Sequence, residues 1–462
     1  MEPRDVIVLG GGPAGYACAL QVADRGLSCV LVEAAELGGT CLHRGCVPTR
    51  AMTEGAALVD AFTHKAERWG IHAVVEKVDF ARLLATRDEI VQRNHVAVRH
   101  HLERARVDVV AGYGRLTGPR TVAVNGNTLV ATRAVVLAMG SVVRRFSRIH
   151  PDGVSILTTD HAFALDHVPR SALILGGGAI GAELSQIWRA LGAEVTILER
   201  EERLVPFEDA DVGAGLARAL RRRGIRCVTG IHVQDVRTNE GGVEVDVTHG
   251  GRAETFAAEV LLLAAGRTPA TADAGLEHAG VERDGAYVVT RNDALETSVP
   301  GVYAVGDLLG PPAPARANAA FAEGMLVAER IAGFGGPGID FAQVPRVTHG
   351  MIETACVGLS EERAAAEGLE PRAATMQLAG VAMGLISGDP GFAKVVTDGD
   401  GGVVGVHLVG PRATELIAGA AAVTSFEASA AEAATIVHAH PTLAETMQEL
   451  YLAHSGRPLH HR

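Results

Sequence analysis

Runs of apolar residues that end in glycine-rich turns are the most regular feature of the chain. Residues 5–15, Asp-Val-Ile-Val-Leu-Gly-Gly-Gly-Pro-Ala-Gly, predict a buried strand, a tight turn and the start of a helix. Residues 171–181, Ser-Ala-Leu-Ile-Leu-Gly-Gly-Gly-Ala-Ile-Gly, repeat that pattern. Each copy is followed by a segment of helical period and then by an apolar run that ends in an acid, Glu33 or Glu199. The repeat predicts two βαβ units.

The rest of the chain has different patterns. Short alternating runs at 120–124 and 243–248 predict small antiparallel strands. After about residue 340, predicted strands at 344–347, 392–397 and 403–409 mix with alanine-rich helices such as 413–423. We therefore expect a third α/β domain at this end of the chain.

Both glycine turns have the spacing of a dinucleotide-binding site. In Gly10-x-Gly12-x-x-Gly15, the glycines permit a tight turn and bring backbone N–H groups to a pyrophosphate at a helix N-terminus. Glu33 follows the first glycine by 23 positions and is expected to accept hydrogen bonds from an adenosine ribose. An empty glycine-rich turn is the alternative for a single copy. The duplication argues against it.

The second copy, Gly176-x-Gly178-x-x-Gly181, has its acid, Glu199, at the same spacing of 23 positions. An acid there suits the free 2′-hydroxyl of NAD and repels the additional phosphate of NADP. The neighbouring Arg200 weakens this inference. We expect NAD rather than NADP.

Two cysteines stand close together in Gly38-Gly-Thr-Cys41-Leu-His-Arg-Gly-Cys46. Positions five apart on a regular helix point roughly 140° apart, at ~100° per residue, whereas a disulfide needs Cβ atoms within about 4.5 Å. We therefore expect irregular backbone here, supplied by Gly45 and Pro48. A helix that starts here would stabilise a thiolate and make a disulfide easy to reduce and re-form. A structural disulfide or a metal site is the alternative, but no Cys or His set at zinc spacing stands elsewhere.

Composition narrows the classes of function. A net charge of −12 argues against nucleic acid as a partner, and the apolar runs are shorter than the roughly 20 residues of a membrane span. The N-terminus shows no signal-peptide pattern, and six cysteines are too few for a secreted disulfide scaffold. We expect a cytoplasmic protein without a metal site. The cysteines outside the pair are expected to be buried core residues: Cys18, Cys29, Cys227 and Cys356.

Taken together, these motifs resemble the flavin-dependent pyridine nucleotide–disulfide oxidoreductase family over essentially the whole chain, and most of all its dihydrolipoamide dehydrogenases. Residues 301–307, which end in Asp307, resemble the family's second flavin motif. Residues 266–269, Gly-Arg-Thr-Pro, resemble the segment that returns from an inserted NAD domain, and residues 438–445 resemble the end of the family's interface domain.

The resemblance implies an α/β fold of two Rossmann-like domains and a C-terminal α/β dimerisation domain. The implied bounds are 1–145 and 265–338 for the FAD domain, 146–264 for the inserted NAD domain, and 339–462 for the interface domain. The implied FAD residues are Gly10, Gly12, Gly15, Glu33, Thr40, Arg50, Gly140 and Asp307, and those on the NAD side are Gly176, Gly178, Gly181, Glu183, Glu199 and Gly266.

The resemblance also implies a catalytic set. Cys41 would form the mixed disulfide with the substrate, and Cys46 would lie against the flavin. His440 would act as the base, because imidazole titrates near neutral pH, and Glu445 would fix its tautomer. In a homodimer, each site would combine the cysteines of one subunit with the histidine of the other.

Some positions depart from the family pattern. Arg50 stands where the family usually has a lysine, which we expect to pair with an acid matching Glu183; arginine is bulkier, planar and harder to deprotonate. Met139 and Asn318 replace a common threonine and a frequent histidine. These departures keep the catalytic groups but suggest a specialised disulfide.

Three hypotheses of function follow. The first is oxidation of dihydrolipoamide with NAD⁺, either free or carried by a 2-oxo acid dehydrogenase complex. The second is reduction of another small-molecule disulfide with NAD(P)H. The third is a degenerate flavoprotein retained as a binding partner. The intact catalytic set argues against the third.

Overall fold

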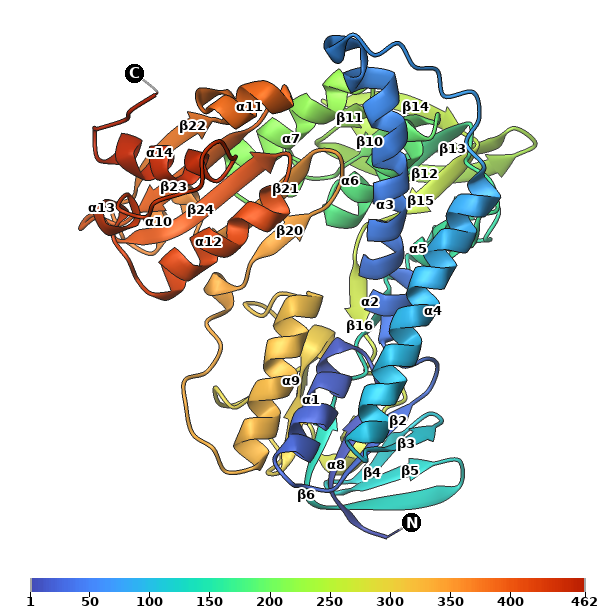
Figure 1. Ribbon diagram of the computed structural model, residues 1–462. Helices are drawn as coiled ribbons and strands as arrows, with labels where there is room; N and C mark the ends of the chain where they lie inside the picture. Colours follow the sequence, from blue (N-terminus) through green and yellow to red (C-terminus); the bar gives the residue numbers. More distant parts are fainter. Residues whose placement is uncertain (1, 461–462) are drawn as a thin grey trace. The chain divides into compact units, whose positions relative to one another are not determined.

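The computed structural model describes residues 2–460 (Figure 1). The chain forms two compact units. The first unit comprises the chain up to Ala51, Leu84–Arg144 and Gly266–Phe341. The second comprises Met52–Leu83, Arg145–Ala265 and the chain from Ala342 onward. The domain bounds expected from the sequence stay a prediction.

The first glycine-rich repeat folds as a βαβ unit, from β1 (Arg4–Leu9) through α1 (Pro13–Asp24) to β2 (Cys29–Glu33). Strand β1 lies between parallel neighbours β2 and β6 (Asn127–Leu137). Its last four residues are at most 2 % exposed, which explains why they are apolar without alternation. The sheet order is β3-β2-β1-β6-β5-β4, with β19 beside β6. The further strands are β3 (Asp108–Ala111), β4 (Arg115–Gly118), β5 (Thr121–Val124) and β19 (Val302–Ala304).

Helix α9 (Ala317–Ile331) packs along α1 in the first unit (Figure 1). The two helices approach closely because α9 carries Gly324, where a Cβ would lie 2.2 Å from the Ala14 carbonyl oxygen. The remaining elements are α2 (Gly39–Arg44), α3 (Cys46–Asp60, which continues into the second unit), α4 (Phe80–Arg104), α8 (Leu276–Ala279), the 3₁₀ turn η3 (Gly306–Leu308), and the antiparallel pairs β7 (Ser141–Val143) with β16 (Arg267–Pro269) and β17 (Arg283–Asp284) with β18 (Tyr287–Val288).

The second repeat forms the parallel sheet of the second unit, in the order β11-β10-β9-β15-β8. Its β9 (Ser171–Leu175) leads through the glycine turn into α6 (Ala179–Ala190) and returns as β10 (Glu194–Leu198). An antiparallel sheet, β12-β13-β14, packs into the same core. The other elements here are β8 (Ile156–Leu157), α5 (Thr159–Ala164), α7 (Ala210–Arg222), β11 (Arg226–Val228), β12 (Ile231–Asn239), β13 (Gly242–His249), β14 (Arg252–Ala258) and β15 (Val260–Leu263).

The C-terminal part of the second unit is an antiparallel sheet in the order β20-β21-β24-β23-β22. Helix α12 (Ala413–Ser425) packs on β21 (Glu353–Gly358) and β24 (Val403–Gly410), and α14 (Glu445–His454) packs on β22 (Arg372–Gln377) and β23 (Phe392–Thr397). The strand predicted at 344–347 begins only at Arg346, as β20 (Arg346–Thr348), after a 3₁₀ turn, η4 (Phe341–Gln343). The remaining helices are α10 (Glu361–Ala366), α11 (Ala382–Ser387) and α13 (Ala430–Ala433).

These elements confirm the predicted fold class: parallel nucleotide-binding-type sheets in both units and a C-terminal α/β domain. The cysteines outside the pair are buried, as predicted. Over residues 2–460, no helix combines the length and the apolar character that crossing a membrane requires.

Candidate active site

The glycine turn of the first repeat gives its three glycines different roles. Gly10 has a φ of +103°, and a Cβ there would lie 2.3 Å from the Ala138 carbonyl oxygen. A Cβ at Gly15 would lie 1.8 Å from the Gly10 carbonyl oxygen. Gly12, by contrast, would place its Cβ 3.9 Å from the nearest described atom, and it caps α1 without a side-chain hydrogen bond. The turn therefore presents open space at a helix N-terminus, which suits a pyrophosphate.

The turn of the second repeat has the same geometry. Gly176 has a φ of +115°, and a Cβ at Gly181 would lie 1.9 Å from its carbonyl oxygen. Gly178 caps α6 with a φ of −73° and a ψ of −172°, the same values as Gly12. A Cβ at Gly178 would meet no atom of the described chain within 4 Å. Both turns thus leave room for a ligand at the position of the middle glycine.

The acids that follow the two repeats are oriented by these turns. Glu33 accepts a hydrogen bond from the Gly11 N–H at 2.5 Å, and Glu199 accepts one from the Gly177 N–H at 2.5 Å. In each case the other carboxylate oxygen accepts from the backbone N–H two residues further on, at 2.7 and 2.8 Å. A carboxylate has about four acceptor positions, so each acid keeps capacity for ribose hydroxyls.

The cysteine pair spans an interruption between two helices. Cys41 lies on α2, which ends at Gly45, and Cys46 is the first residue of α3. Gly45 has a ψ of −114°, and a Cβ there would lie 3.0 Å from the Thr40 carbonyl oxygen. The predicted irregularity is confirmed at Gly45. It is wrong for Pro48, which lies in the first turn of α3, where a missing N–H is tolerated.

The two thiols interact directly. A hydrogen bond between Cys41 and Cys46, together with burial, holds the pKa of the Cys41 thiol well above its usual range. Because Cys46 starts α3, the helix N-terminus favours negative charge on its sulfur.

Two further groups lie close to Cys41. The Asp307 carboxylate adds to the upward shift of the Cys41 pKa. Burial, with a smaller contribution from Cys41, raises the pKa of Tyr16 to about 12. Tyr16 also packs edge to face on Phe321 of α9, with ring centroids 5.4 Å apart. The charge on the second flavin-motif acid therefore acts on the thiol of Cys41.

Two histidines support the backbone just before the cysteine pair. Both bond the Leu37 carbonyl oxygen, His43 through Nε2 at 2.8 Å and His95 through Nδ1 at 3.1 Å. The next residue, Gly38, donates its N–H to the Gly11 carbonyl oxygen at 2.8 Å. The start of α2 is thereby attached both to α4 and to the first glycine turn.

Asp307 is held by the strand pair β7 and β16. Ser141 donates to its Oδ2 at 2.5 Å, and Arg267 donates from Nε to the Ser141 hydroxyl oxygen at 2.8 Å. Gly140, with a φ of +70°, and Gly266, with a φ of +107°, directly precede these two strands. Both glycines therefore belong to the first unit, together with Asp307.

His440 and Glu445 form a close pair in the second unit. The His440 Nδ1 lies 2.6 Å from Glu445 Oε1, and Glu445 Oε2 accepts the Thr442 N–H at 2.8 Å. Glu445 begins α14, and the hydrogen bond from His440 holds the pKa of its carboxyl below the usual range. The imidazole is 73 % exposed, so its Nε2 face is open to a substrate or to another subunit.

The remaining predicted residues lie on helices. Thr40 is on α2 and Arg50 on α3, both half-buried in the first unit. Glu183 is on α6 in the second unit, where its Oε1 accepts the His349 N–H at 2.9 Å. The functional roles of all these residues stay predictions.

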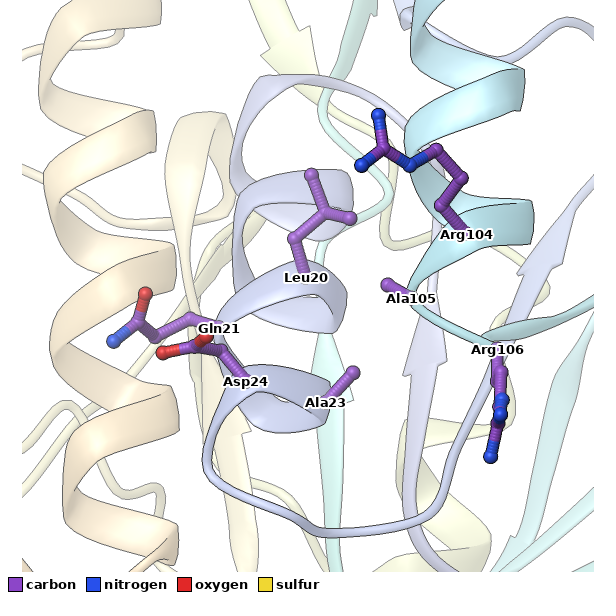
Figure 2. A pocket seen from close by; sticks show the side chains of 7 residues that line it. All are labelled: Leu20, Gln21, Ala23, Asp24, Arg104, Ala105 and Arg106. Atoms are coloured by element: carbon purple, nitrogen blue, oxygen red, sulfur yellow. The ribbon is translucent and has the colours of Figure 1, made fainter.

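A surface hollow of about 730 Å³ lies in the first unit, between the end of α1 and the end of α4 (Figure 2). Its lining residues are Leu20, Gln21, Ala23, Asp24, Arg104, Ala105 and Arg106. The predicted site residues are not among them. The candidate site is organised around the glycine turns and the cysteine pair instead.

Sequence patterns missed several residues of this site. Ser141 and Arg267 had no motif that linked them to Asp307, and the signal that could have found them was their position directly after Gly140 and Gly266. Glu323 on α9 also went unnoticed, although an acid inside an apolar helical pattern is a signal. Its Oε2 accepts the Gly306 N–H.

Comparisons with known proteins identify the family of this chain. Residues 4–324 match the pyridine nucleotide-disulphide oxidoreductase family, and residues 344–451 match that family's dimerisation domain, which implies a homodimer. Members of this family bind FAD and NAD(P). A dihydrolipoyl dehydrogenase of Thermus scotoductus is 36 % identical over 465 residues, which cover 100 % of this chain and 99 % of its own.

Two further similarities span the chain. The dihydrolipoyl dehydrogenase of Bacillus subtilis is 31 % identical over 472 residues, covering 99 % of both proteins. The crystal structure of LpdA from Mycobacterium tuberculosis superposes on this structure with a TM-score of 0.88 at 26 % identity. The superposition covers 97 % of this chain and 99 % of the LpdA chain. The chain therefore belongs to the pyridine nucleotide–disulfide oxidoreductase family and is a flavoprotein disulfide oxidoreductase similar to dihydrolipoamide dehydrogenase.

Proposed function

We propose that this protein oxidises dihydrolipoamide to lipoamide with NAD⁺, through a redox disulfide between Cys41 and Cys46. The observation that carries the proposal is the hydrogen-bonded thiol pair across the break at Gly45, next to the first glycine turn. The full-length similarity to dihydrolipoyl dehydrogenases supports this substrate. By the same similarity, the dithiol is free or carried by a 2-oxo acid dehydrogenase complex.

The first step is thiol–disulfide exchange at Cys41. His440 takes the proton of one substrate thiol, and the resulting thiolate attacks the Cys41 sulfur. A bond forms between the substrate and Cys41, the Cys41–Cys46 bond breaks, and Cys46 leaves as a thiolate. The field of the α3 N-terminus stabilises that charge.

The second step releases the product. The remaining substrate thiol attacks the substrate sulfur of the mixed disulfide, its proton passes to Cys41, and the cyclic disulfide leaves. The Cys41 thiol then donates a hydrogen bond to the Cys46 thiolate. The first glycine turn and Asp307 are the residues that would hold FAD, which would supply the two-electron chemistry between the sulfur pair and NAD⁺.

Glu445 keeps the imidazole ready for this proton transfer. Its carboxylate on Nδ1 leaves Nε2 as the atom that accepts a proton, and it stabilises the imidazolium that forms. Its second oxygen is anchored by the Thr442 N–H, so the carboxylate holds a fixed orientation.

The test is a substrate panel with the purified protein. Dihydrolipoamide with NAD⁺ should be turned over faster than other dithiols, and Cys41→Ser and Cys46→Ser should each abolish that reaction. Cys227→Ser is the matched control, because burial raises the pKa of that thiol to about 11 and keeps it unreactive. If NADH or NADPH reduces a different disulfide faster than the protein oxidises dihydrolipoamide, that disulfide is the substrate instead of lipoamide. Absence of bound FAD would reject the proposed mechanism altogether.

A further inference from the structure

Glu323 is a fully buried acid next to the second flavin motif. It lies on α9 with 0 % of its surface exposed. Its Oε2 accepts the N–H of Gly306, the residue directly before Asp307. Its Oε1 is buried without a hydrogen-bond partner among residues 2–460. A carboxylate in this position would carry a full charge with half of its acceptor capacity unused.

The surroundings of Glu323 add negative rather than positive charge. Asp307 of η3 is the charged group that acts on it. Helix α1, which packs along α9, carries the titratable groups Tyr16 and Cys18, and burial raises the pKa of each to about 12. Both are therefore neutral near pH 7. Burial, together with the Asp307 charge, raises the pKa of the Glu323 carboxyl to about 7, although the Gly306 N–H opposes this shift.

Because of this geometry, the protonation state of Glu323 affects Asp307, which is expected to bind FAD. Asp307 is fixed between the Ser141 hydroxyl on one side and the Gly306 turn on the other. A neutral Glu323 accepts the Gly306 N–H without repelling Asp307. An ionised Glu323 places a second carboxylate beside Asp307 in a buried region that must also hold the negatively charged pyrophosphate of FAD.

We propose that Glu323 is a positioning residue that holds a proton when FAD is bound, and that loss of this proton weakens the binding of FAD. The inference rests on the FAD binding in the proposed function and extends it to a residue outside the glycine and aspartate motifs. By linkage, the protein with FAD binds this proton more tightly than the protein without FAD. The FAD dissociation constant then rises by up to about ten-fold per pH unit between the pKa of Glu323 in the FAD-free protein and its higher pKa in the FAD-bound protein, and it levels off above the latter.

The experiment measures FAD retention by the holoenzyme as a function of pH. Holoenzyme is diluted to equilibrium between pH 6 and 9, and free flavin is read from its fluorescence. The wild-type dissociation constant should rise with a slope approaching about ten-fold per pH unit above pH 7. Glu323→Gln, which retains an acceptor for Gly306 but cannot ionise, should change less than about three-fold over the same range.

A matched control and a second variant isolate the effect. Glu329→Gln removes an acid from the same helix at its surface ion pair with Arg25 and should follow the wild-type pH profile. If Glu323→Gln does not fold, Glu323→Met fills the site with an apolar side chain. This variant should bind FAD more weakly than the wild type, and its FAD dissociation constant should not rise with pH.

The outcomes separate the two proposals. A wild-type profile that is flat between pH 6 and 9, or the same slope in wild type and Glu323 variants, overturns the role of Glu323 and leaves the proposed function intact. If the protein neither purifies with FAD nor binds added FAD, both the role of Glu323 and the proposed function are wrong.

Discussion

Two carboxyl groups of this protein respond to their surroundings in opposite ways. Glu445 lies at the start of α14, and its hydrogen bond with His440 lowers the pKa of its carboxyl. Its contribution to stability is therefore present above the ordinary carboxyl pKa and is lost as the pH falls through the lowered value. Burial raises the pKa of Glu323 to about 7, so its contribution is present at low pH and is lost as the pH rises toward 7.

The Glu445 carboxylate is expected to matter for proton transfer rather than for folding. Glu445→Gln should reduce kcat for dithiol oxidation by about 10²- to 10⁴-fold, because the imidazole loses its fixed tautomer and the charge that stabilises its protonated form. Steady-state kinetics with dihydrolipoamide measure this loss. Reduction of ferricyanide by NADH should stay within about two-fold, because that reaction needs no substrate thiol.

Glu415→Gln is the control for this substitution. Glu415 is an exposed acid on α12 of the same C-terminal domain. It should leave both reactions unchanged. Equal losses of dithiol oxidation and ferricyanide reduction in Glu445→Gln would instead indicate a general structural defect.

At the level of secondary-structure elements, the two βαβ units have the same turn geometry but differ in the residues that surround the acid. Each presents an open middle glycine and an acid tied to the turn. In the second unit the acid is followed by Arg200, which the sequence left as a possible partner for the phosphate of NADP. The structure pairs Arg200 with Glu201 at 2.6 Å. That ion pair competes with any phosphate for the guanidinium group.

We therefore expect a preference for NAD. The kcat/KM for NADH should exceed that for NADPH by at least about ten-fold, because the Glu199 carboxylate repels a 2′-phosphate. Glu199→Ser should lower this ratio, whereas Arg200→Ala should change it by less than about two-fold. Steady-state kinetics with both nucleotides measure the ratio. An NADPH efficiency equal to or above that of NADH would contradict the assignment.

At the scale of the whole molecule, the predicted catalytic residues belong to different units: Cys41 and Cys46 lie in the first and His440 in the second. The family's dimerisation domain covers residues 344–451, which include His440 and Glu445. We expect a symmetric homodimer in which the cysteines of one subunit work with the histidine of the other.

Hybrid dimers test this arrangement. Cys46→Ser and His440→Ala proteins should each be nearly inactive alone. In a hybrid dimer, one site carries both lesions and the other carries neither. Random reassembly of equal amounts gives half hybrids, so dithiol oxidation should return to roughly a quarter of the wild-type value. The double variant mixed with Cys46→Ser should recover nothing. Demonstrated subunit exchange without recovery in the first mixture would falsify the shared site.

The features that the sequence determined by itself are local ones. The turn at Gly10 to Gly15 needs a positive φ and a close approach between residues a few positions apart, so its spacing predicts its geometry. The cysteine pair is similar, because a disulfide between positions five apart does not fit one regular helix, and the backbone is irregular at Gly45. Continuous apolar runs likewise predicted the buried parallel strands, because strands covered on both faces need no alternation.

Tertiary structure alone decided the contacts that bring distant residues to the site. Ser141 and Asp307 are 166 positions apart, His95 and Leu37 are 58 apart, and Glu323 meets Gly306 across 17 positions. No periodicity predicts such pairs, because they depend on how α4, α9 and the β7–β16 pair pack against the first glycine turn. Burial is also set by that packing. It raises the pKa of the Glu323 carboxyl from that of an ordinary helix acid to about 7.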